Sequence, residues 1–306
     1  MSSAPFKLSY LLPRHWPSWL VIALSWMLAR MPLSWQQAST QWLTTRLAKT
    51  DIDRVRTIRT NIDLCFPEAS AEYKLELINA NIQASVQVLF DVVNVAWRQK
   101  ETVLKPGRII GEEHLQEALA SDKPTLLVSA HFTSFVVAIA KLAEVVPYHV
   151  VYRRFDSPIL ESHLVQRVRD NYQLTLIHRK DIRDMLVELG SGGTVIIVPD
   201  QDFGLKRGAF VPFFGIPTAT VTTIPQYAQQ TGAQVLLYSV YRENDGYVVE
   251  IDPVLENYPS GDDVADTQLW SDWLEEKIRL HPEQYFWMHK RFKTRPAGEP
   301  NPYKKT

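Results

Sequence analysis

The fold is decided by the stretch Thr125-Leu126-Leu127-Val128-Ser129-Ala130-His131-Phe132-Thr133-Ser134. Its first six residues form a short, strongly apolar run, which is the pattern of a buried β-strand. A histidine and a group of small polar residues follow the run directly. The stretch therefore predicts a buried strand that delivers His131 into a loop, where its ring is well placed to act as a general base.

Short apolar or β-branched runs recur through the second half of the chain, and helical patterns lie between them. The expected strands are 125–130, 148–152, 174–177, 195–198, 235–241 and 247–251. The expected helices are 134–144, 158–172, 183–189, 221–231 and a final amphipathic helix over 266–280. Strands that alternate with helices predict an α/β fold with a mostly parallel sheet flanked by helices.

The region before these strands reads as helical. Apolar residues at spacings of three and four predict helices over 39–47, 51–64 and 71–97. Pro67 interrupts the pattern, and Ser70 is a good helix start. We expect an N-terminal segment over 1–35, one domain with a helical N-terminal part over 36–296, and a loose tail over 297–306.

The bulk composition excludes several classes of protein. The chain has 306 residues, a formal net charge of −1 and one cysteine, Cys65. No global positive field for binding nucleic acid exists. One thiol can form neither an intramolecular disulfide nor a cysteine-based zinc cluster.

The first forty residues are rich in tryptophan, with Trp16, Trp19, Trp26 and Trp35 around an apolar run. Tryptophan at both ends of such a run is typical of a membrane interface. The run over 16–29 is short for a full span, which needs about 20 apolar residues. A membrane-inserted or interfacial anchor is the main hypothesis for this segment, and a transmembrane helix is one form of it; a buried core helix and a signal peptide are the alternatives.

Three polar clusters follow expected strands, and in open α/β sheets ligands bind beyond the carboxyl ends of the strands. The clusters are 131–134, 152–156 and 199–204. A lone histidine after a strand is more often structural than catalytic, so both interpretations of His131 stay open. Ser134 lacks the glycine-flanked elbow of a hydrolase nucleophile.

Asp200 and Asp202 stand one residue apart after an apolar strand. They could be a metal pair, but no further ligands are evident, so no metal is expected. A turn with Asx hydrogen bonds, or an acid that holds an arginine or histidine in the site, explains them better.

Two further clusters have both an ordinary and a functional interpretation. Phe210, Phe213 and Phe214 belong to an aromatic run closed by Gly215, which is either core or the wall of an acyl-chain slot. The basic segment 290–296 is either a solvated surface or a contact for anionic lipid head groups or acidic proteins.

Several motifs, in order and nearly end to end, resemble the late lipid A biosynthesis acyltransferases, of lauroyl and myristoyl type, within the lysophospholipid acyltransferase superfamily. The matching segments are 12–16, 61–68, 126–132, 178–181, 199–204, 210–214 and, as the most specific, Pro282-Glu283-Gln284-Tyr285-Phe286-Trp287-Met288-His289-Lys290-Arg291-Phe292-Lys293-Thr294-Arg295-Pro296.

The resemblance implies an enzyme on the cytoplasmic face of the inner membrane, without a cofactor. It implies transfer of a fatty acyl group from acyl carrier protein to a hydroxyl on an acyl chain of a Kdo-bearing lipid A precursor. His131 matches the family's general base and Asp200 the first acid of its Pro-Asp-x-Asp motif. Arg153 and Arg167, with Arg169 as the alternative to Arg167, match cations that hold phosphate or the thioester oxyanion.

One position departs from the family pattern of a histidine followed, five positions on, by an acid. Val136 stands where that acid is expected. Three explanations remain: another acid such as Asp156, Asp200 or Asp202 reaches His131; the acceptor's own phosphate assists; or the chain is a weak or inactive relative. A different lipid acceptor and a non-catalytic lipid-binding role are the alternative functions.

Overall fold

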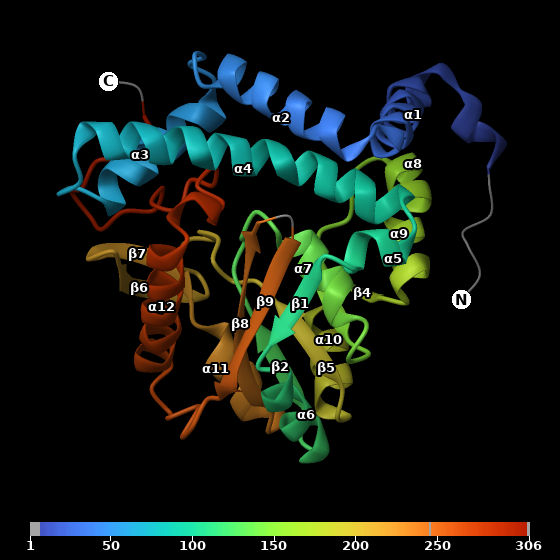
Figure 1. Ribbon diagram of the computed structural model, residues 1–306. Coiled ribbons are helices and arrows are strands. Elements are labelled where there is room, and N and C mark those ends of the chain that lie inside the picture. The colour runs from blue at the N-terminus through green and yellow to red at the C-terminus, as the bar shows by residue number, and fades with distance from the viewer. Residues whose placement is uncertain (1–6, 245, 305–306) are drawn as a thin grey trace.

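A computed structural model describes residues 7–244 and 246–304. Its centre is a seven-stranded sheet with the strand order β1-β9-β8-β2-β5-β3-β4 (Figure 1). The strands are β1 (Gly107–Ile110), β2 (Thr125–Val128), β3 (His149–Tyr152), β4 (Thr175–His178), β5 (Thr194–Ile197), β8 (Gln234–Glu243) and β9 (Gly246–Val254). All neighbouring pairs are parallel except β8 and β9, which form an antiparallel hairpin. The expectation of a mostly parallel α/β sheet is confirmed.

Each expected strand and helix of the second half is present, with ends shifted by a few residues. The helices are α7 (Phe135–Leu142), α8 (Pro158–Leu160), α9 (Gln166–Tyr172), α10 (Ile182–Gly190), α11 (Thr223–Thr231) and α12 (Asp263–Leu280). One turn of π-helix, Glu161–Val165, joins α8 to α9. The strand β1 and the helix α6 (Glu112–Ala120) are additional elements.

The aromatic run over 210–215 forms a hairpin, which the sequence analysis did not anticipate. Strand β6 (Gly208–Phe213) pairs with β7 (Ile216–Val221) in a separate two-stranded sheet. Phe214 and Gly215 form the two-residue turn, with φ of 52° and 72°. Such a turn needs positive φ at both positions, and here only one of them is a glycine.

The region before β1 forms a helical layer over the edge of the sheet where β2 and β8 end (Figure 1). It contains α1 (Trp16–Arg30), α2 (Leu33–Leu47), α3 (Asp53–Cys65), α4 (Ala71–Trp97) and the short α5 (Lys100–Leu104), preceded by two 3-10 turns, Leu8–Leu11 and Pro13–His15. The side chain of Ser70 caps α4 by accepting from the backbone N–H of Tyr73.

Helix α1 exposes many of its apolar side chains. Trp16, Leu20 and Met27 are more than half exposed, and Trp35 and Trp42 on α2 are likewise exposed. Within 7–244 and 246–304, no helix is both long and apolar enough to cross a membrane, so the expected spanning helix is not found there.

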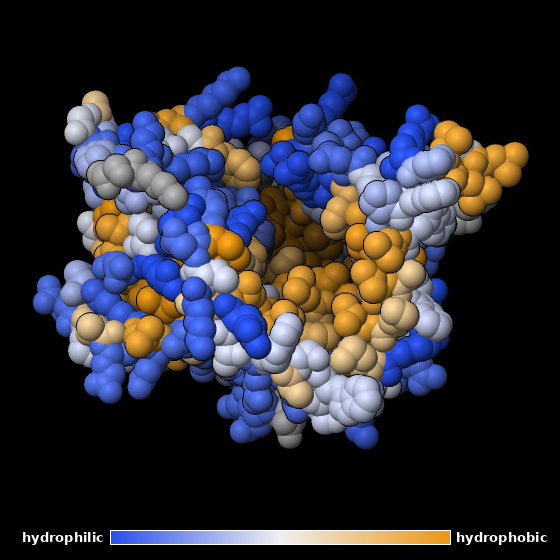
Figure 2. Space-filling view, turned by 90° about the horizontal axis from the view of Figure 1, so that it is seen from above, coloured by the Kyte–Doolittle hydropathy of each residue, from blue (hydrophilic) through white to orange (hydrophobic). Residues whose placement is uncertain are grey.

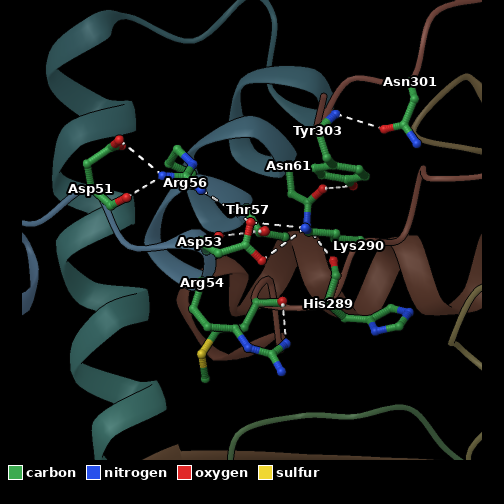
Figure 3. Close-up of polar contacts among 11 residues, drawn as sticks. Asp51, Asp53, Arg54, Arg56, Thr57, Asn61, His289, Lys290, Asn301 and Tyr303 are labelled. Carbon is green, nitrogen blue, oxygen red and sulfur yellow. Dashed lines mark hydrogen bonds and ion pairs between the residues drawn. The ribbon is translucent and has the colours of Figure 1, made fainter. Parts of the chain in front are cut away.

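The C-terminal segment packs against α3 and α4 rather than lying free in solvent. Asn61 of α3 donates to the carbonyls of Trp287 and His289, at 2.7 and 2.8 Å, and accepts from the hydroxyl of Tyr303. Figure 3 shows the contacts of Asn61 with His289 and Tyr303. Lys290 forms an ion pair with Asp53 of α3 at 2.9 Å. Tyr303 lies within the segment that was expected to form a tail.

The basic cluster over 290–296 is therefore not a free, solvated patch. Arg291 is 1 % exposed and donates to Ala219 O and to the Thr220 hydroxyl of β7. Arg295 pairs with Glu299. The cluster fixes the end of the chain to the rest of the molecule.

Candidate active site

The register of β2 and β5 brings His131 and Asp200 together. These two strands are parallel neighbours, and Val128 is the register partner of Ile197. His131 and Asp200 each follow those partners by three residues. Because the strands end at the same edge of the sheet, the two loops begin side by side.

Asp200 holds His131 through two hydrogen bonds. Its Oδ1 lies 2.5 Å from Nδ1 of the His131 ring, and its Oδ2 accepts from the His131 backbone N–H at 3.0 Å. Tyr285, a buried residue of the C-terminal segment, donates its hydroxyl to the same Oδ2 at 3.0 Å. The carboxylate is thus held on both oxygens and orients the imidazole.

Burial and charge act in opposite directions on this pair. Burial alone would lower the pKa of His131, but the charge of Asp200 and its hydrogen bond to the ring raise that pKa above the ordinary value. Burial would raise the pKa of Asp200, but the same contact with His131 holds that pKa below the ordinary value. Burial, followed by the charge of Asp200, raises the pKa of Tyr285 well above its usual range, so Tyr285 stays a neutral donor.

The other ring nitrogen of His131 is the one that can accept a proton. An ionised carboxylate only accepts hydrogen bonds, so Nδ1 carries the hydrogen and Nε2 the lone pair. The side chain keeps 22 % of its surface exposed. The Gln201 amide nitrogen lies 3.4 Å from Nε2, which is long for a hydrogen bond. The geometry suits a general base, because Asp200 fixes Nδ1 and the ring stays partly exposed.

Asp202, the second acid of the motif, has a structural environment. Its oxygens accept from the backbone N–H of Gly204 and from the backbone and hydroxyl of Thr294, at 2.8–2.9 Å. Its own N–H donates to His289 Nε2 at 3.1 Å. Burial lowers the pKa of His289 to about 4, so the ring is neutral and accepts this bond near pH 7. Asp202 therefore joins the loop after β5 to the C-terminal segment.

The position that lacks the family's acid lies at the start of α7. Val136 is half-buried and packs against the hydrophobic core. The ring of its neighbour Phe135 lies beside His131, with ring centroids 5.6 Å apart.

The arginines assigned from the family resemblance make contacts outside the His131–Asp200 pair. Arg167 Nε donates to the Ala96 carbonyl at 2.8 Å, and its guanidinium lies over the ring of Trp97. Arg169 lies 3.6 Å from Asp170. Arg153 is exposed and lies 3.6 Å from Asp156.

The aromatic residues over 210–214 pack into a cluster. Phe213 is fully buried and contacts Phe214 and Phe292, while Phe210 and Phe214 are half-buried. Seen from the side of the helical layer, the surface is hollowed at its centre, and the walls of the hollow are apolar (Figure 2). A hollow of this kind suits an acyl chain.

The described residues contain no group of three or more His, Cys, Asp or Glu side chains that could hold a metal ion. Tyr285 and Gln201 are the site residues that sequence reasoning did not single out. Both lie inside motifs that were quoted for the resemblance, but nothing local distinguishes a tyrosine that contacts a distant aspartate from a core tyrosine.

Comparison with known proteins identifies relatives over almost the whole chain. The model of the family described as "Bacterial lipid A biosynthesis acyltransferase" matches residues 3–294. The chain is similar to a lipid A biosynthesis lauroyltransferase of Escherichia coli (strain K12), with 30 % identity over 99 % of this chain and 100 % of the relative. It is also similar to a palmitoleoyltransferase of the same organism, with 30 % identity over 97 % of this chain and 98 % of the relative. A lipid A biosynthesis acyltransferase of Haemophilus influenzae (strain ATCC 51907 / DSM 11121 / KW20 / Rd) is 28 % identical over 95 % of this chain and 94 % of the relative.

Proposed function

The chain belongs to the bacterial lipid A biosynthesis acyltransferases, and on that premise we propose that it transfers an acyl group from acyl carrier protein to a hydroxyl of a Kdo-bearing lipid A precursor, with His131 as the base. The observation that carries the proposal is the hydrogen bond between Asp200 and His131 Nδ1. It supplies the orienting acid that Val136 cannot.

The reaction follows from this arrangement. His131 Nε2 takes the proton of the acceptor hydroxyl as the hydroxyl oxygen attacks the thioester carbonyl. The negative charge of Asp200 stabilises the imidazolium that forms, as the aspartate does in serine protease triads. When the tetrahedral intermediate collapses, the C–S bond breaks, and the imidazolium returns the proton to the carrier's thiolate. A new ester and a free thiol result.

Other residues have supporting roles in the proposal. Gln201 lies beside Nε2 and is placed to donate to the oxygen of the incoming hydroxyl. The free Nη groups of Arg167, and Arg153, serve to bind substrate phosphate or the developing oxyanion. Phe210 and Phe214 are proposed as walls of the acyl slot, with Phe213 behind them.

We place the enzyme on the inner membrane, facing the cytoplasm, through residues 1–35. The exposed apolar side chains of α1 and the tryptophans at its ends support an interfacial mode, in which the helix lies in the head-group region. A variant lacking residues 1–35 should shift from the membrane fraction toward the soluble fraction.

The deciding experiment is an assay of purified protein with acyl carrier protein thioester and a Kdo-bearing, tetra-acylated lipid A precursor. Turnover by the wild type, lost in His131→Ala, supports the proposal. Turnover with another lipid acceptor alone would show that the lipid A precursor is not the substrate. Tight lipid binding without turnover would show that the chain is a non-catalytic relative.

A further inference from the structure

Three segments that follow β3, β4 and β5 at the carboxyl edge of the sheet carry a group of exposed cations. We call them the cationic rim, and its members are Arg153, Arg154, Arg179, Lys180, Arg183, Lys206 and Arg207, all exposed. The same three segments, 153–156, 179–184 and 203–207, contain only three acids, Asp156, Asp181 and Asp184. A local excess of positive charge therefore exists in a protein whose net charge is −1.

The sheet brings these loops together. Tyr152 and His178 are register partners at the ends of β3 and β4, and the Arg179 N–H donates to the Tyr152 carbonyl at 2.8 Å. Ile182 and the residues Leu205, Lys206 and Arg207 line one open pocket of about 430 Å³. The cations of all three loops thus face solvent at one edge of the molecule.

Few of these cations are neutralised internally. Within the described part of the chain, Arg153 is the member of the rim with an ion pair, at 3.6 Å to Asp156. Arg154 interacts with the Tyr152 side chain and with the charges of Glu161 and Asp181, and the other five cations of the rim have no ion pair there. Unpaired, exposed cations contribute little to folding stability, so their concentration in one place is better explained by a partner.

Exposed apolar side chains lie among the cations. Phe155, Phe203 and Leu205 are 50 %, 55 % and 44 % exposed. Large apolar groups beside arginines are typical of protein–protein interfaces. The rim is also continuous with the site, because the loop that carries Lys206 and Arg207 begins at Asp200, the partner of His131.

We propose that the cationic rim is the docking surface for an acidic carrier protein, which presents the acyl thioester to His131 on a flexible arm. This inference rests on the proposed function for its choice of donor. Complementary charge steers the carrier to the rim and fixes its orientation, and the exposed apolar residues complete the contact.

Anionic lipid is the competing occupant of this surface. Ser157, which follows the first loop, contacts Ser18 of α1 at 2.8 Å, so one side of the rim adjoins the proposed membrane helix. The continuity of the rim with the Asp200 loop favours the carrier, because the thioester must reach His131.

Two double charge reversals test the docking surface, Lys206→Glu with Arg207→Glu and Arg179→Glu with Lys180→Glu. The matched control is Lys105→Glu with Lys123→Glu, which changes the net charge equally at exposed positions outside the rim. Binding of acyl carrier protein to the full-length protein in detergent, and transfer from the carrier and from an acyl-pantetheine thioester, are measured for each.

We expect both rim variants to weaken carrier binding and raise KM for the acylated carrier by about tenfold or more. Transfer from acyl-pantetheine, and binding to vesicles containing anionic phospholipid, should be the same in the rim variants as in the control variant. Unchanged carrier binding, an equal loss in the control, or a selective loss of vesicle binding would each overturn the docking surface.

The experiments distinguish failure of the proposed acyl transfer from failure of the proposed docking surface. If the wild type binds the carrier through the rim but transfers no acyl group, the docking surface stands and the proposed reaction falls. If transfer occurs and is insensitive to the rim reversals, the reaction stands and the docking surface falls.

Discussion

The hydroxyl of Tyr285 lies 3.0 Å from Oδ2 of Asp200, the carboxylate that orients His131. A residue near the end of the chain thus completes a hydrogen-bonded series that starts at the sheet edge. Tyr285→Phe removes one donor to a buried charge and should lower kcat about tenfold, which corresponds to about 1.4 kcal/mol of barrier. The control is Tyr303→Phe, which loses a hydroxyl bonded to Asn61 instead. Its kcat should stay at the wild-type value, and equal losses in both variants would show that Tyr285 acts only on folding.

His131→Ala should reduce turnover by about 10²–10⁴-fold, the usual cost of losing a general base. Thermal unfolding should stay cooperative, because the ring is partly exposed. His114→Ala, on α6, is the matched control and should leave turnover unchanged. A folded His131→Ala variant with near-normal turnover would reject His131 as the base.

The dependence of kcat/KM on pH should reflect the contact between His131 and Asp200. The base works only when it is unprotonated, so kcat/KM should rise with pH through the raised pKa of His131 and level off above it. Asp200→Asn removes the negative charge that stabilises the imidazolium, so the variant's pKa should fall and the rising limb should move to lower pH. Its plateau should drop by roughly 10³–10⁴-fold, as for the triad aspartate. If the rising limb of the Asp200→Asn profile stayed at the wild-type pH, Asp200 would not be the group that raises the pKa of His131.

Val136→Glu separates two accounts of the missing acid. Asp200 already occupies Nδ1, so an added carboxylate on α7 has no orienting role to fill. Turnover should stay equal to the wild type or fall, because Val136 packs against the core and a buried charge is costly. Val136→Leu is the control for volume. A marked gain in the glutamate variant would show that Asp200 does not serve as the acid.

Asn61→Ala should lower the free energy of unfolding by about 1–3 kcal/mol, because it leaves the buried carbonyl of Trp287 and the partly buried carbonyl of His289 without their donor. Urea unfolding followed by circular dichroism measures the change. The exposed amide of Gln83 on α4 provides the comparison, since Gln83→Ala should stay within about 0.5 kcal/mol of the wild type. Equal stability of the two variants would mean that water replaces the lost amide.

Much of the fold could be predicted because its strands are short, apolar and separated by helical patterns. The run 125–130 was identified as a strand for this reason, and His131 at its end followed. The hairpin β6–β7 was missed because its turn needs positive φ at Phe214, a residue that rarely adopts it. The strand β1 was missed because it begins with Gly107 and Arg108, so that only Ile109 and Ile110 contribute to an apolar run.

The sequence predicts which loops form the candidate site, but not which side chains in them make contact. Parallel strands end at one edge, so Asp200 and Asp202 were both reasonable partners for His131. Which acid contacts the ring depends on register: Val128 pairs with Ile197, which aligns position 200 and not 202. Contacts from distant segments, such as Tyr285 with Asp200 and Arg291 with β7, depend on tertiary packing that leaves no local pattern.

The C-terminal segment has a consequence for the biosynthesis of the protein. Phe286 donates its N–H to the carbonyl of His131, and Thr133 donates to that of Gln284, so the loop after β2 is held by residues that the ribosome adds only after the last strand of the sheet, β9. A nascent chain that already contains the sheet still lacks the hydroxyl on Asp200 and the backbone partners of the His131 loop. Assembly of the candidate site therefore depends on the synthesis of residues 284–286 as well as that of the sheet, and a product truncated directly after β9 would contain the whole sheet without a finished site.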